Sequence, residues 1–226
     1  MPTPPLPSAT MSIDAAGWCP QAVRRASPNH DVRPDGRAID LLVIHNISLP
    51  PGQFGGPYIE ALFENRLDCD AHPYFDRLRS LQVSAHFLIR RDGSVLQFVS
   101  TLQRAWHAGV SEFAGEQRCN DFSIGIELEG SDDVPFEAAQ YASLAMLTVA
   151  LEQRHVLKNV VGHEHVAAGR KTDPGPFFEW GLYYASYAAY ANQRESNQVE
   201  RVLPYGSSWG HADIQDASVL RFFSIS

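Results

Sequence analysis

Four short apolar runs predict the strands of a sheet. Residues 41–46, LLVIHN, are rich in aliphatic side chains and precede the turn-rich SLPPGQFGGP, which favours a buried strand with His45 near its end. VSAHFLI and SVLQFVS flank RRDG, and an Asp-Gly pair between two strand-like runs predicts an antiparallel hairpin over residues 83–100. A further short run, NVVG, predicts a strand that delivers His163 to the loop after it.

Residues 123–130, SIGIELEG, alternate strictly between aliphatic and other side chains. In a strand, successive side chains point to opposite faces, so the three aliphatic side chains share one face. The other face holds Gly125, Glu127 and Glu129. The pattern predicts a strand with one face in the core and one face that carries carboxylates.

Two later segments show helical spacing. Between residues 136 and 155 the large apolar side chains recur three or four residues apart, and the preceding SDDVP supplies acidic and proline start signals. In WGLYYASYAAYANQ, the aromatic residues at 183, 184, 187 and 190 have the same spacing. We therefore expect the α/β (α+β) class, as a single domain with a central mixed β-sheet flanked by helices.

The domain boundaries follow from composition. Residues 1–11 are rich in proline and predict a flexible leader, residues 12–191 carry the periodic patterns of a folded domain, and residues 192–226 are weakly patterned and predict a C-terminal tail of uncertain order. The 226-residue chain is 44% hydrophobic, which is enough for a substantial core.

The net charge and the sequence segments searched for targeting signals limit the kinds of binding partner that we expect. The formal net charge is -8 and no Lys/Arg run compensates for it, so nucleic acid is not an expected partner. No segment approaches the roughly 18 uninterrupted apolar residues of a membrane span, and MPTPPLPSAT lacks the basic and apolar regions of an export signal. We expect a cytoplasmic protein with no membrane partner. The three cysteines are widely separated and lack CxxC spacing, which predicts reduced thiols.

Histidines at two strand ends suggest a metal site. His45 and His163 each follow a predicted strand and could project from the same edge of the sheet, while Asp173 lies on a Pro/Gly-stiffened loop that could fold back toward them. Two imidazoles and one carboxylate leave a tetrahedral zinc ion with an open position for water, as hydrolytic sites require. The alternative for any one histidine is an ordinary hydrogen-bonded structural role.

Three neighbouring residues need separate interpretation. His163 and His165 in HEH are two residues apart, not the four of the metalloprotease HExxH motif, so we expect His165 to be exposed or structural. Glu127 is the best candidate for a general base, because Gly125 on the same face would leave room for a ligand; the alternative is a solvated carboxylate. Lys171 could direct its ammonium at a developing oxyanion, or be merely solvated.

Six ordered motifs carry a family resemblance. VIHNISLPPGQFGGPYIEALF, AHPYF, VSAHFLIRRDGSVLQFV, RAWHAGVSEF, RCNDFSIGIELEG and GRKTDPGPFFEW resemble the AmpD-type N-acetylmuramoyl-L-alanine amidases, over about residues 12 to 182. The resemblance implies a zinc-amidase fold related to peptidoglycan recognition proteins. It also implies that His45, His163 and Asp173 bind zinc, that Glu127 is the general acid/base, and that Lys171 stabilises the tetrahedral intermediate.

The same resemblance implies substrate and reaction. The substrate would be a muropeptide with a 1,6-anhydro-N-acetylmuramic acid, cut at its amide bond to L-alanine during peptidoglycan recycling, with no obligate protein partner. Asn46, Trp106 and Arg118 fall where the family contacts the muramyl sugar and the stem peptide. His107 belongs to the same RAWHAG motif as Trp106, and we expect it to line the substrate cleft. The chain departs from the family at Gln82, where a basic residue is usual, which puts one carboxylate contact in doubt.

Two other functions compete with this hypothesis. Some peptidoglycan recognition proteins bind muropeptides without cleaving them, but those typically lose a metal ligand, and this sequence has a full set. An exported lysin that acts on the intact wall would be expected to carry a signal peptide or a wall-binding repeat, and we recognise neither pattern in the sequence.

Overall fold

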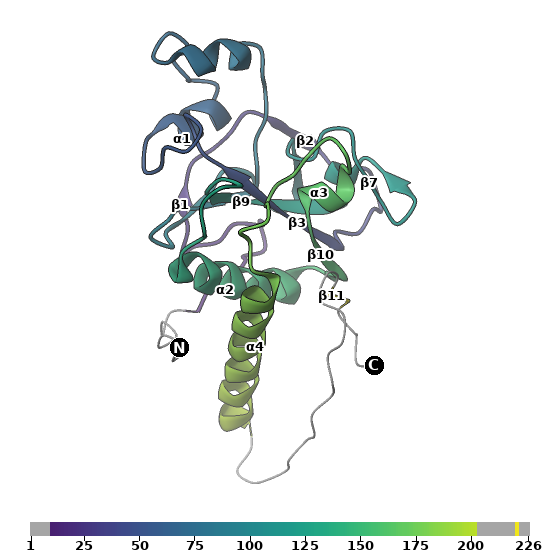
Figure 1. Ribbon diagram of the computed structural model, residues 1–226. Helices are drawn as coiled ribbons and strands as arrows, with labels where there is room; N and C mark the ends of the chain where they lie inside the picture. The colour runs from purple at the N-terminus through teal and green to yellow at the C-terminus, as the bar shows by residue number, and fades with distance from the viewer. Residues whose placement is uncertain (1–9, 203–219, 222–226) are drawn as a thin grey trace.

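A seven-stranded mixed sheet forms the centre of the computed structural model, which describes residues 10–202 and 220–221 (Figure 1). Its four adjacent strands β4, β9, β3 and β10 run parallel, and β5 and β11 pair antiparallel to β4 and β10. In sheet order the strands are β1 (Val23–Arg24), β5 (Val95–Gln97), β4 (Phe87–Ile89), β9 (Ser123–Glu129), β3 (Leu41–Ile47), β10 (Asn159–Gly162) and β11 (Leu220–Arg221). The predicted mixed sheet and the hairpin of β4 and β5 are confirmed.

Smaller elements surround this sheet. Two short antiparallel pairs are formed by β2 (His30–Val32) with β6 (Gln103–Ala105), and by β7 (Glu112–Phe113) with β8 (Glu116–Gln117). The helices are α1 (Tyr58–Phe63), α2 (Ala138–Arg154), α3 (His163–Val166) and α4 (Trp180–Val202), with 3₁₀ turns η1 (Pro73–Leu78) and η2 (Cys119–Asp121). None of the short pairs showed a clear pattern in the sequence.

The aliphatic face of the sheet packs on α2, and α4 packs on α2 in turn (Figure 1). Leu42, Ile124 and Ile126 are fully buried in this core together with Leu144 of α2. A capping box between Glu137 and Gln140 satisfies backbone groups where α2 begins, so the predicted helix start is supplied by these two residues rather than by SDDVP.

The face of β9 that was predicted to carry carboxylates does so, and it is covered as well as the aliphatic face. All seven residues of β9 are buried. Glu129 is 1% exposed and accepts hydrogen bonds from Arg90 Nη1 at 2.8 Å and the backbone N–H of Gly55 at 2.7 Å. The strand alternates as predicted, but it lies in the middle of a parallel sheet, where loops and helices cover both faces.

The ends of the predicted domain lie within ordered structure. Met11 is 9% exposed in the main core, and its carbonyl accepts a hydrogen bond from Arg194 of α4 at 3.1 Å. Helix α4 continues through the predicted boundary at residue 191 to Val202. Residues 1–9, 203–219 and 222–226, which include most of the predicted leader and tail, lie outside the described part of the chain. Within the described part, no helix combines the length and the apolar character needed to cross a membrane.

Candidate active site

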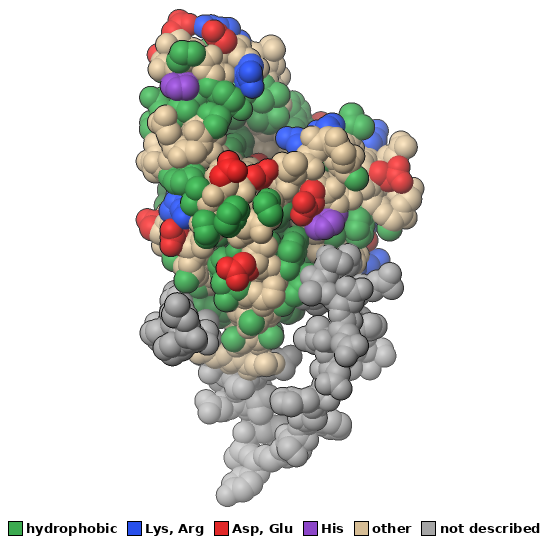
Figure 2. Space-filling model, in the orientation of Figure 1, with side chains coloured by type: hydrophobic (Ala, Val, Ile, Leu, Met, Phe, Trp, Pro, Cys, Tyr) green, Lys and Arg blue, Asp and Glu red, His purple; other side chains and the backbone are tan. Residues whose placement is uncertain are grey.

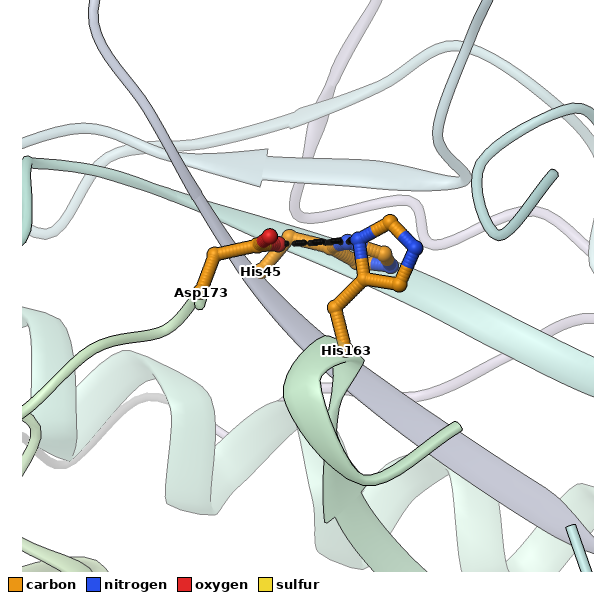
Figure 3. A group of neighbouring side chains, drawn as sticks. All are labelled: His45, His163 and Asp173. Carbon is orange, nitrogen blue, oxygen red and sulfur yellow. Dashed lines mark hydrogen bonds and ion pairs between the residues drawn. The ribbon is translucent and has the colours of Figure 1, made fainter. Parts of the chain in front are cut away.

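Three side chains converge at the carboxyl end of the parallel strands (Figure 3). His45 Nδ1 lies 2.9 Å from His163 Nδ1, and each of these nitrogens lies 3.0 Å from Asp173 Oδ2. The three residues are between 1% and 9% exposed. Their donor atoms lie close enough together to hold one metal ion. The structure therefore brings together the two histidines and the aspartate that the sequence predicted as ligands.

Strand register explains how the two histidines meet. β3 and β10 are parallel, and Ile44 lies opposite Gly162. His45 follows Ile44 and His163 follows Gly162, so the two imidazoles project side by side from the same edge of the sheet. The loop that follows α3 returns to this edge, where the carbonyl of Asp173 accepts a hydrogen bond from the N–H of Glu164 at 2.9 Å.

The outer nitrogens of the two histidines are also engaged. His163 Nε2 lies 3.1 Å from the carbonyl oxygen of Ala108, which can only accept, so this nitrogen carries the proton. His45 Nε2 lies 3.0 Å from His107 Nδ1. Burial lowers the pKa of His45 to about 4, so its ring is neutral at neutral pH, as a metal ligand must be.

Glu127 lies opposite His45 in the pairing of β9 with β3. Its side chain is 9% exposed, and its Oε2 has no hydrogen-bond partner among the described residues. Burial raises the pKa of this carboxyl well above its usual value and the charge of Asp173 raises it further, while the ammonium of Lys171 acts in the opposite direction. The alternative of a solvated Glu127 is therefore wrong. A buried carboxyl with a raised pKa is suited to exchanging a proton with a reactant.

Asp173 experiences two opposed effects. Burial alone would raise the pKa of its carboxyl, but the close approach of the His163 and His45 imidazoles lowers that pKa below the usual value. The carboxylate is consequently charged at neutral pH, whereas Glu127 a short distance away is biased toward its protonated form. Two carboxyl groups of one site are thus set up for different roles.

The predicted substrate residues do not all share one surface. Asn46 donates from Nδ2 to Asp132 Oδ1 at 2.7 Å and to the carbonyl of Pro174 at 3.0 Å, and Trp106 is half-buried at the end of β6. Arg118 is exposed beside Asp121, and Lys171 is exposed in the loop before Asp173. His107 is 9% exposed and contacts His45 rather than an open surface, which corrects the expectation that it lines the cleft.

The space above Gly125 is filled, which corrects a second expectation. The imidazole of His107 lies directly against the backbone of Gly125, where a Cβ atom would overlap the ring. The glycine therefore makes room for a side chain of the same protein, not for a ligand. His107 Nε2 in turn lies 3.2 Å from the hydroxyl of Ser123, at the start of β9.

A groove of about 560 Å³ lies next to α3, but none of the three ligand side chains lines it. Its walls include Gly109, which follows Ala108, and the last turn of α3, which begins at His163. Arg118 and Arg170 bring positive charge to it. In the view of Figure 2 the surface is recessed between the lobe that carries α1 and the side that carries β7, with acidic side chains below the recess.

Three residues of this region were not predicted from the sequence. Asp132 positions the amide of Asn46, Ser123 contacts His107, and Arg170 donates to the carbonyls of Ala108 and Val110 at 2.8 and 2.6 Å. Ser123 lies two and four residues before Gly125 and Glu127, so the strand period already placed it on their face. Asp132 and Arg170 lie in irregular segments, where no period could point to them.

The family model of N-acetylmuramoyl-L-alanine amidases (Amidase_2) matches residues 35–176, which include every residue placed in the site above. This chain belongs to that family. It is an N-acetylmuramoyl-L-alanine amidase of the AmpD type. The 1,6-anhydro-N-acetylmuramyl-L-alanine amidase AmpD of Citrobacter freundii is 55% identical over 171 residues, covering 75% of this chain and 91% of the relative.

Other relatives agree with this assignment. AmpD of Escherichia coli K12 is 54% identical over 169 residues, which is 74% of this amidase and 92% of the relative. A crystal structure of a selenomethionine AmpD derivative superposes with a TM-score of 0.75 at 53% identity, and covers 78% of this amidase and 99% of that chain. The fold predicted from the sequence is confirmed by this likeness.

The contact between Gly125 and His107 leads to a stability prediction. Gly125→Ala should lower the free energy of unfolding of the metal-free amidase by about 1–3 kcal/mol, because the added methyl group must displace a buried ring. Gly181→Ala in α4 is the matched control: nothing lies near its Cβ position, and alanine should stabilise the helix by up to about 1 kcal/mol. Urea denaturation measures both; equal effects of the two substitutions would contradict the described packing.

Proposed function

We propose that this amidase uses a zinc ion, held by His45, His163 and Asp173, to hydrolyse the amide bond between 1,6-anhydro-N-acetylmuramic acid and L-alanine. The observation that carries the proposal is the buried convergence of two imidazole nitrogens and one carboxylate oxygen within about hydrogen-bond distance of one another. The names of the curated AmpD relatives support the substrate.

The chemistry of the donor set fits zinc. His163 directs an unprotonated Nδ1 into the cluster because its Nε2 donates to a carbonyl, and Asp173 directs a charged oxygen toward the same point. Such a group of acceptors is stabilised by a cation, and two imidazoles with one carboxylate are a common ligand set of hydrolytic zinc. A bound zinc ion would supply Lewis acidity, which acidifies a water molecule and polarises a carbonyl.

Glu127 is the proposed proton carrier. Its carboxylate would accept a proton from the attacking water and then donate it to the departing amine of L-alanine, so one group serves both steps. Its burial and its unpartnered Oε2 support this role, because the raised pKa lets the group hold the proton between the two transfers. The ammonium of Lys171, whose charge reaches Glu127, would stabilise the oxyanion that develops on the carbonyl.

Substrate recognition is proposed on both sides of the metal site. Arg118 lines the groove and could bind a carboxylate of the stem peptide through its planar guanidinium. Asn46 and the half-buried Trp106 would contact the muramyl end, where an indole ring can cover the compact apolar surface of an anhydro-sugar. The cytoplasmic recycling role that the sequence resemblance implies belongs to the same proposal, and fractionation of cells that express the full chain tests the location.

The metal proposal predicts zinc content. The purified amidase should contain one zinc ion per chain and lose activity on chelation, and His163→Ala should lower the zinc content measured by elemental analysis. His165→Ala is the matched control, because His165 instead accepts a hydrogen bond from the N–H of Gly162 at 2.8 Å and contacts Trp180. Loss of zinc in His165→Ala but not in His163→Ala would contradict the ligand assignment.

The role of Glu127 predicts a separation of rate from metal binding. Glu127→Gln should retain zinc and lower kcat by about 10²- to 10⁴-fold, because the amide side chain keeps the shape but cannot carry the proton. Glu164→Gln removes a neighbouring carboxylate on α3 and should change kcat only a few-fold. Turnover of Glu127→Gln near that of the unmodified amidase would exclude Glu127 as the proton carrier.

The proposed substrate is tested by competition between two sugars. Mass spectrometry should show that kcat/KM is higher for a 1,6-anhydro-muropeptide than for the same peptide on reducing N-acetylmuramic acid. The reducing sugar presents hydroxyl groups where an apolar surface is expected, and these groups would be poorly paired. Equal kcat/KM values, or rapid release of peptide from intact sacculi, would refute the recycling substrate while leaving the amidase chemistry intact.

A further inference from the structure

A chain of hydrogen bonds leads from His45 into the interior of the protein. His45 Nε2 lies 3.0 Å from His107 Nδ1, and His107 Nε2 lies 3.2 Å from Ser123 Oγ. The hydroxyl of Ser123 lies 2.6 Å from the carbonyl oxygen of Cys119. The side chains of His107 and Ser123 are buried, so this chain runs from the proposed metal site to a backbone carbonyl without crossing the surface.

The final carbonyl gives the chain one direction. The oxygen of Cys119 can only accept, and its short distance to Ser123 indicates that the serine hydroxyl donates to it. Ser123 Oγ then offers a lone pair to His107, so His107 Nε2 carries the proton and His107 Nδ1 is an acceptor. That acceptor faces His45 Nε2 and favours a proton there, whereas Asp173 Oδ2, 3.0 Å from His45 Nδ1, favours a proton on Nδ1 until a cation takes its place.

Other contacts hold this chain of hydrogen bonds from His45 through His107 and Ser123, here called the relay, in its arrangement. The ring of His107 lies against Gly125 and meets the ring of His45 edge-on, with an interplanar angle of 86°. The neighbouring His86 is engaged elsewhere, because its Nδ1 accepts from the N–H of Gly125 at 3.0 Å and its Nε2 lies 3.1 Å from the carbonyl of Gln103. The nitrogens of His107 thus face His45 on one side and Ser123 on the other.

We propose that His107 and Ser123 are positioning residues that fix the tautomer of His45 and so present its Nδ1 lone pair to the metal. For His163, the backbone carbonyl of Ala108 does this directly. For His45 Nε2, the nearest fixed acceptor is two side chains away, and the relay transmits its direction. This inference rests on the proposed function, because the tautomer of His45 is set jointly by the relay and by the cation that replaces the proton on its Nδ1.

The relay also accounts for a residue that the reaction leaves unused. His107 does not contact the groove, and its position behind His45 places it where partners of metal-binding histidines are found. Loss of such a partner typically lowers metal affinity by about 10- to 100-fold. The effect expected here is of that size, without loss of any metal ligand.

Nitrogen-15 NMR of the zinc-loaded amidase tests the direction of the relay. At pH 8, long-range proton–nitrogen spectra should show His107 as the Nε2–H tautomer. An Nδ1–H tautomer of His107 in the zinc-loaded protein would overturn the inference, because the ring would then donate to His45 instead of accepting from it.

Zinc affinity, measured with a competing chelator, tests the consequence. Ser123→Ala should weaken zinc binding by about 10-fold or more. Ser143→Ala is the matched control, since it also removes a buried hydroxyl that donates at 2.6 Å to a backbone carbonyl, that of Gly93. It should leave zinc affinity unchanged. Equal affinities of the two variants would overturn the relay.

A second pair of variants separates the hydrogen bond from packing. His107→Asn keeps an acceptor near the position of Nδ1, whereas His107→Leu has none; the asparagine variant should bind zinc more tightly than the leucine variant. Equal zinc affinities of these two would show that His107 acts by volume alone and would overturn the inference. If the unmodified amidase binds no zinc, the proposed function fails and the inference fails with it; if it binds zinc but the variants of Ser123 and His107 do not differ from their controls, only the inference fails.

Discussion

The parallel pairing of β3 with β9 on one side and β10 on the other is the constraint on which the site depends. It places His45 opposite Glu127, and it brings His163 to the position that follows the pair of Ile44 and Gly162. Because side chains alternate between the faces of a strand, a slip of one residue in either pairing would move these side chains to the opposite face of the sheet. The buried aliphatic face against α2 prevents such a slip, so the packing of the core also determines the geometry of the chemistry.

Burial gives the site its electrostatic character. In a poorly solvated environment a charged group is costly unless it is paired, and a neutral group stays neutral. His45 is kept uncharged, the pKa of Asp173 is lowered, and Glu127 Oε2 has no hydrogen-bond partner among the described residues. The loop after β6 contributes to this environment from above, since His107 closes the space over Gly125. The loop after β6, which covers this face of the sheet, is therefore part of the site and not only a support for it.

Much of this arrangement could be predicted from local sequence patterns, and the remainder depends on contacts between distant segments. β3 is a continuous aliphatic run, β9 and α2 have clear periods of two and about 3.6 residues, and the predicted positions of all three agree with the structure. The burial of Glu127 could not be read from β9, because it comes from loops that the strand pattern does not describe. The two- and three-residue strands are too short to show a period. The sequence NQRESNQVE, at residues 192–200, has no apolar stripe, so the continuation of α4 was not predicted although its residues permit a helix.

The ion pair between Arg90 and Glu129 limits which substitutions the hairpin of β4 and β5 can accept. Glu127 and Glu129 lie on the same face of one strand, about 6.7 Å apart along it, yet only Glu129 meets a guanidinium and a backbone N–H. An arginine shifted by one such step would hold Glu127 as a permanent anion and end its capacity to carry a proton. Substitutions in the hairpin of β4 and β5 are thus restricted in two ways. A positive charge must stay beside Glu129, and a positive charge must not pair with Glu127.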